Sequence, residues 1–141
     1  MELNEFHFFV GQTIMYCQII EHDIKRIYAA MRKGGYYENL EKVETWTLGK
    51  CVIKLKEMDF ETDDHYISAD DYNFLKQITE KRNHWCHQTY QNFLYNKLFL
   101  QSNEYANECR KLQRDNKKLS NVCDALEKVR IKAQKEFRND I

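Results

Sequence analysis

Six consecutive residues near the middle of the chain, Arg82 to His87, read RNHWCH and bring together an Arg, an Asn, two His and a Cys, side chains that could do chemistry. Histidine has an unperturbed pKa of about 6.5, which suits proton transfer near neutrality and makes His87 an acid–base candidate. Arg82 offers a permanently charged planar fork for phosphate oxygens, and Asn83 could orient either group or bind an oxygen. Cleavage of RNA by its own 2′-hydroxyl needs a base, an acid and a cation for the phosphorane charge, and it requires no metal.

The same residues admit other interpretations. His84, Cys86 and His87 are spaced closely enough for zinc ligands, but a structural zinc site normally needs four donors and the sequence has no second paired cluster. Cys86 as a nucleophile lacks an identifiable base. The plainest alternative is a polar network that satisfies a helix break. We expect no metal and no cofactor, and the catalytic and structural interpretations both stay open.

The chain that must position these residues is expected to be all-helical. It has no Pro and only four Gly in 141 residues, whereas sandwiches and barrels need many tight turns. Its 43% of hydrophobic residues is enough for the core of one soluble domain. No run approaches the ~20 apolar residues of a membrane span.

Charge and cysteine usage restrict the partners and the compartment. The 22 Lys and Arg balance 22 Asp and Glu, so a broad basic surface for duplex nucleic acid is not expected, although a compact site for a few phosphates is compatible with this balance. Five Cys without a C-x-x-C pair are typical of reduced thiols in a cytosol-like compartment. The N-terminal residues MELNEFHFFV lack the features of a secretion signal. We predict a cytoplasmic protein with no membrane partner.

Apolar residues recur at helical spacing along most of the chain. They predict an up-and-down bundle of four to five helices with a long C-terminal helix. Gly34-Gly35 should end the first helix, and Ser68 with Asp71 resembles a capping box. Whether the third helix runs through RNHWCH, or Asn83 caps a new helix there, is open. The expected helices cover about residues 5–32, 45–58, 69–100 and 103–137, with a loop or short helix at 36–44.

The C-terminal helix carries apolar residues four and three apart, as in a heptad seam. Asn116 and Arg130 interrupt this seam. Such a seam serves either a coiled coil with another chain or packing along its own domain, with Val122 and Val129 on the inner side. We accordingly divide the chain into a helical bundle at 1–101 and a long C-terminal helix at 102–141.

Arg82-Asn83 followed by His87 fits the R-N-x-x-x-H motif of the HEPN superfamily, and the chain resembles that family over about residues 5–100. Leu48-Gly49 resembles the "LG" segment often found upstream of the motif. The resemblance implies an all-helical homodimer that cleaves single-stranded RNA without a metal, with Arg82, Asn83 and His87 as catalytic residues. It further implies a role in toxin–antitoxin or phage-defence systems, with an antitoxin or defence protein as a partner.

Spacing places a geometric condition on this site. Residues five apart on an unbroken α-helix are rotated by about 140°, so Arg82 and His87 would not share a face. Either a helix begins between them, or two chains combine their motifs across a two-fold axis, as the resemblance implies.

Two further residues are secondary candidates, His84 and Tyr90. In a toxin subgroup of the family, a Tyr two residues after the His receives a nucleotide from the antitoxin. Position 89 is Thr here, and Tyr90 lies on the His87 face only if the helix is regular. A non-catalytic helical dimeric adaptor, or a nucleotide-binding module, is the alternative to an enzyme.

Overall fold

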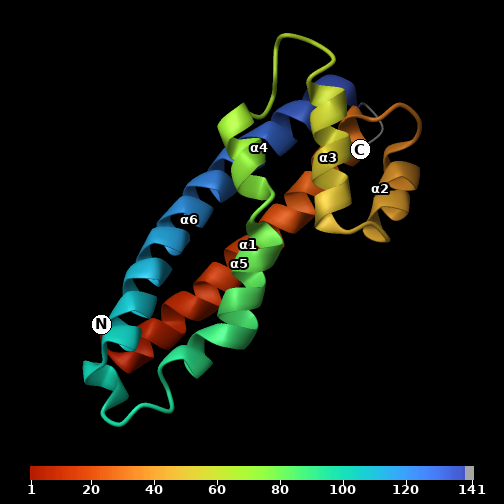
Figure 1. Cartoon of the computed structure of the whole chain (residues 1–141). Coiled ribbons are helices and arrows are strands. Elements are labelled where there is room, and N and C mark those ends of the chain that lie inside the picture. Colours follow the sequence, from red (N-terminus) through yellow and green to blue (C-terminus); the bar gives the residue numbers. More distant parts are fainter. Residues whose placement is uncertain (139–141) are drawn as a thin grey trace. The chain divides into compact units, whose positions relative to one another are not determined.

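The computed structural model describes residues 1–138, and within them every regular element is helical and no strand occurs (Figure 1). The predicted all-α fold with a long C-terminal helix is confirmed. Over the same residues, no helix is long and apolar enough to cross a membrane. The elements are α1 (Leu3–Met31), α2 (Tyr36–Glu44), α3 (Leu48–Asp59), α4 (Ala69–Leu75), α5 (Ile78–Asn83), the π-helical turn η1 (His84–Gln88), the 3₁₀ turns η2 (Thr89–Asn92) and η3 (Phe99–Gln101), and α6 (Asn103–Phe137).

Helix boundaries follow local signals where the sequence carries them. Gly34 ends α1 with a φ of 101°, in the left-handed region that glycine tolerates. Ser68 caps α4 as predicted, because its hydroxyl accepts the Asp71 N–H at 3.1 Å. Thr47 caps α3 in the same way at 3.2 Å. The segment 36–44, which the sequence left open, is helix α2.

The helical span expected from residue 69 to about 100, for which a break at RNHWCH was left open, is interrupted at other places. α4 ends at Leu75, and residues 93–98 form irregular turns up to Leu98, whose φ of 51° is left-handed. Asn83 does not cap a new helix, because its backbone is helical (φ −61°, ψ −40°) and its side chain makes no capping hydrogen bond. The spacing of apolar residues indicates which side chains are buried. This spacing is nearly the same in a continuous helix and in a helix that is interrupted by turns.

Packing divides the chain into two compact units, each of which takes one part of α1 and one part of α6. The first unit comprises Met1–Gln18 and Ile78–Asn121. The second unit comprises Ile19–Gln77 and the chain from Val122 onward. The division expected after residue 101 coincides with the start of α6 and, as a domain boundary, stays a prediction.

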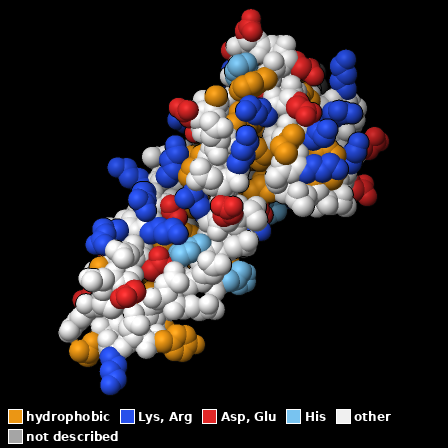
Figure 2. Space-filling model, viewed as in Figure 1, with side chains coloured by type: hydrophobic (Ala, Val, Ile, Leu, Met, Phe, Trp, Pro, Cys, Tyr) orange, Lys and Arg blue, Asp and Glu red, His pale blue; other side chains and the backbone are white. Residues whose placement is uncertain are grey.

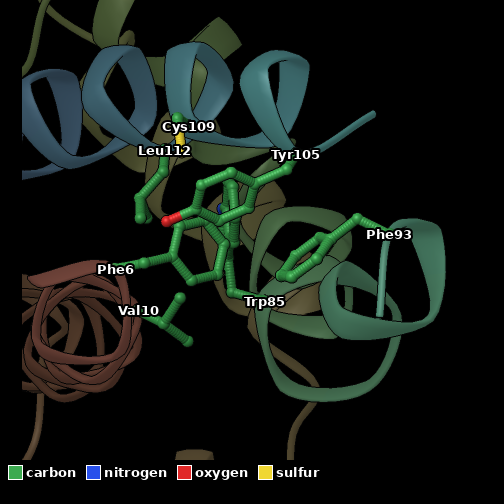
Figure 3. Packing of buried hydrophobic residues seen from close by; sticks show 7 residues of the cluster. All are labelled: Phe6, Val10, Trp85, Phe93, Tyr105, Cys109 and Leu112. Carbon is green, nitrogen blue, oxygen red and sulfur yellow. The ribbon is translucent and has the colours of Figure 1, made fainter. Parts of the chain in front are cut away.

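The core of the first unit is built around Phe6 (Figure 3). Its ring is fully buried, and the ring centroids of Phe93 and Tyr105 lie 5.4 and 5.5 Å from its own. Contacts of this kind add about 0.5–1.5 kcal/mol each beyond the burial of area. The cluster is completed by Val10, Trp85, Cys109 and Leu112.

Asp59, the last residue of α3, organises the second unit. Its carboxylate is 2% exposed and accepts the N–H groups of Tyr66 and Ile67 at 2.8 and 3.1 Å. It also accepts the Tyr72 hydroxyl at 2.7 Å. Burial and this bond raise the pKa of Tyr72. These three bonds tie the acidic connection after α3 to both α3 and α4.

The predicted heptad face of α6 is occupied within the chain. In the first unit, Asn116 donates to Gln12 Oε1 at 3.0 Å and to Thr13 Oγ1 at 3.1 Å. In the second unit, Arg130 Nε lies 3.1 Å from Asp23 Oδ1. Both interruptions of the seam therefore face α1 of the same chain, which is the second of the two expected alternatives. A coiled coil with another chain would need other side chains of α6, and it stays a prediction.

Replacing Phe6 by Ala should lower the free energy of unfolding by about 3–5 kcal/mol, because the substitution leaves a cavity among aromatic rings. Phe8, two residues further along the chain, is 63% exposed. Phe8→Ala should change the free energy of unfolding by about 0.5 kcal/mol or less. Urea unfolding followed by circular dichroism measures both. Equal losses for the two variants would contradict the packing described here.

Candidate functional site

The RNHWCH residues lie where α5 continues into the π turn η1. The N–H of Thr89 bonds the carbonyl of His84, five residues back, so the turn is wider than a turn of α-helix. Trp85 lies on its inner side with 1% of its surface exposed. Asn83 and His87 are exposed.

One buried carboxylate of α6 holds the start of this turn. Asp115 is 4% exposed. Its Oδ2 accepts the indole N–H of Trp85 at 3.0 Å, and its Oδ1 pairs with Lys81 Nζ at 2.9 Å. A carboxylate that loses its water needs such partners, because the desolvation of an unpaired charge costs several kcal/mol.

A second buried carboxylate, two turns earlier on α6, holds the rest of the segment. Glu108 is 6% exposed. Its Oε1 lies 2.8 Å from His84 Nε2 and accepts the Asn92 amide at 2.9 Å. His84 is therefore directed toward α6. Among residues 1–138, no three His, Cys, Asp or Glu side chains are grouped so that they could hold a metal ion.

The predicted catalytic residues are found on the outer part of the turn. Asn83 and His87 are both exposed. Arg82 is partly buried and interacts with another group. α5 passes into η1 at His84 without a break in the helical backbone, so Arg82 and His87 belong to one continuous helical segment and not to two separate helices.

Tyr90 lies on the core side and not beside His87. Its hydroxyl is 2.7 Å from His7 Nδ1, its ring centroid is 5.7 Å from that of Phe6, and burial raises its pKa. Its expected place on the His87 face required a regular helix, and η2 is a 3₁₀ turn. Thr89, at the position of the modified Tyr in the toxin subgroup, is fully buried.

Reasoning from sequence missed Glu108 and Asp115. They stand seven residues apart on α6, each directly before a seam position, and therefore share one side of the helix. Two carboxylates repeated at heptad spacing beside an apolar seam are the signal that could have found them.

No family model, no curated protein and no solved structure matches the chain. A role for this turn therefore depends on the geometry described above and on the R-N-x-x-x-H resemblance.

Cys86, exposed on η1, should react first when the folded protein meets a thiol reagent such as Ellman's reagent near pH 8. Burial raises the pKa of Cys51 to about 12, so its thiolate is scarce at that pH and Cys51 should react only on unfolding. Cys86→Ala should remove the fast phase, which stopped-flow absorbance measures. A fast phase that survives this change would contradict the outward placement of Cys86.

Glu108→Ala should lower the free energy of unfolding by about 2–4 kcal/mol, because His84 and Asn92 lose their shared buried acceptor. Glu127→Ala, at an exposed position of the same helix, should have an effect of about 0.5 kcal/mol or less. Urea unfolding measures both variants. A Glu108 variant as stable as the Glu127 variant would show that this network does not hold the turn.

Proposed function

We propose that the chain is a metal-independent endoribonuclease of the HEPN type that cleaves single-stranded RNA. The observation that carries the proposal is the outward placement of Asn83 and His87 on a turn whose inner side Asp115 and Glu108 fix. A solvent-facing imidazole on a rigid turn is suited to proton transfer with a large substrate. The R-N-x-x-x-H resemblance supplies the class of reaction.

The roles follow from the chemistry of each side chain. The 2′-oxygen attacks the adjacent phosphorus and the 5′-oxygen leaves, which gives a 2′,3′-cyclic phosphate and a 5′-hydroxyl. His87 transfers protons in this reaction. Arg82 stabilises the charge that develops on the phosphate oxygens, and Asn83 orients them.

A symmetric homodimer completes the proposed site. Arg82 and His87 lie on one continuous helical segment, on which Arg82 is partly buried and His87 is exposed. A two-fold axis would bring Arg82 of one protomer to His87 of its partner. It would also supply two imidazoles, one to accept the proton of the 2′-hydroxyl and one to protonate the leaving oxygen.

Two costly features of the turn support a functional role. π-helical turns are rare in proteins, and those that occur are often found at functional sites. Within the described residues, the buried hydroxyl of Thr89 has no hydrogen-bond partner, at a cost of about 1–3 kcal/mol. A segment whose only role was structural would gain stability by losing both features.

The biological setting belongs to the same proposal. An RNA-cleaving domain of this kind would act in the cytoplasm, in a toxin–antitoxin or phage-defence system, under the control of an antitoxin or defence protein. The alternative is a non-catalytic dimeric adaptor or nucleotide-binding module. The exposed apolar segment after η2 favours an adaptor, since Leu94, Tyr95, Leu98 and Leu100 are 45–86% exposed.

His87→Ala should reduce cleavage of labelled single-stranded RNA at least about 100-fold, the usual loss for a general acid–base group. Arg82→Ala should cause a similar loss. Gln88→Ala, at an exposed position of the same turn, is the matched control and should cleave like the wild type. Cleavage is followed with EDTA present, and light scattering gives the mass of each protein.

A 2′-deoxy substitution at the cleaved position should abolish the reaction, because the attacking group is then missing. Cleavage by the His87 variant at the wild-type rate would refute the assignment. No cleavage by a folded, dimeric wild type would favour the adaptor.

A further inference from the structure

Trp46 stands at an unusual place for an indole. It lies between α2 and α3, directly before the Thr47 cap, and it is partly exposed. The other tryptophan, Trp85, is 1% exposed. Trp46 rests on Tyr28 of α1, with the ring centroids 5.2 Å apart. The indole is therefore supported on one side and accessible from solvent on another.

Two lysines converge on this indole. Lys50 Nζ lies 4.5 Å from the ring centroid and Lys42 Nζ lies 5.9 Å from it, within the range of a cation–π contact. Both lysines are exposed. An ammonium group on a flexible stem can leave the ring for a phosphate when another planar group stacks there. Figure 2 shows Lys and Arg side chains over α3 and α2, with Asp, Glu and apolar side chains among them.

A hollow of about 540 Å³ is lined in part by Tyr28, the residue against which Trp46 packs. Its apolar wall also includes Met31 and Met58. The charged residues of the lining are Arg32, Lys33, Lys54, Glu57 and Glu61. Lys54 lies 3.6 Å from Glu57, so the cations only slightly outnumber the acids there. Trp46 does not line this hollow, and the hollow does not attract anions strongly by itself.

We propose that Trp46, with Lys42 and Lys50, is a binding site for single-stranded nucleic acid, in which one base stacks on the indole and the lysines bind the flanking phosphates. All of its residues belong to the second unit. An aromatic side chain with lysines around it is the usual means of holding an unpaired strand without sequence preference. In a duplex the base faces are already stacked, so the indole would gain nothing from it.

Oligo-thymidine of about 12 nucleotides tests this site. It has no 2′-hydroxyl, so the proposed cleavage cannot act on it and binding is measured separately. Trp46 fluorescence should be quenched on binding, and the buried Trp85 should contribute little to the change. With the two lysines on phosphates, log affinity should fall with log salt with a slope of about −1.4.

The variants separate stacking from charge. Trp46→Leu should weaken binding by about 5- to 150-fold, as the loss of one stacked base does, and Trp46→Phe should retain most of it. Lys50→Gln should make the salt slope shallower by about 0.7. Lys97→Gln, at an exposed position of the first unit, should change nothing. Anisotropy of a labelled oligomer measures affinity for every variant.

An abasic oligomer of the same length and inorganic polyphosphate are the decisive competitors. Both should compete much more weakly than oligo-thymidine for the wild type, and Trp46→Leu should remove the advantage of the bases. Equal competition by the abasic oligomer would overturn the proposal in favour of simple anion binding. Absence of oligo-thymidine binding at low salt, or unchanged affinity in Trp46→Leu, would overturn it as well.

Discussion

Two buried carboxylates on α6 decide how the RNHWCH turn is held. A carboxylate that leaves water needs hydrogen bonds or a cation in its place. Asp115 obtains them from Trp85 and Lys81, and Glu108 obtains them from His84 and Asn92. The α5–η1–η2 segment is therefore fixed to α6 by directed polar bonds as well as by apolar contact. Directed hydrogen bonds fix how far a helix is rotated about its own axis. Apolar packing defines this rotation less sharply.

This constraint separates two histidines that residue type alone does not distinguish. His84 and His87 belong to one short segment, and only the R-N-x-x-x-H resemblance selects His87. Glu108, which lies 24 residues beyond His84, binds His84 and turns it inward. His87 is left outward on a turn that the same network makes rigid. Residue type predicted the chemistry of the motif, but a distant carboxylate decided which imidazole meets solvent.

The fold could be predicted as far as its causes are local. The absence of Pro, the apolar periodicity, the left-handed Gly34 and the Ser68 cap are each readable within a few residues. The π turn and the irregular backbone up to Leu98 depend on the side chains that pack against them. The periodicity of apolar residues does not predict either feature. The end of α1 shows both kinds of cause. Gly34 marks it locally, whereas two of its carbonyls, Ala29 O and Ala30 O, accept hydrogen bonds from the distant Arg138 at 2.8 and 2.9 Å.

The even balance of charge limits how this protein could meet a polyanion. With 22 basic and 22 acidic residues, no long-range field draws a nucleic acid toward it. Affinity would have to come from a few short-range contacts, such as an indole with two lysines near its ring. Contacts of that kind act on base faces and single phosphates, which an unpaired strand exposes and a duplex stacks away. A neutral protein would therefore favour single strands over duplexes. Stacking on an unpaired base does not depend on net charge, and a duplex offers no free base face.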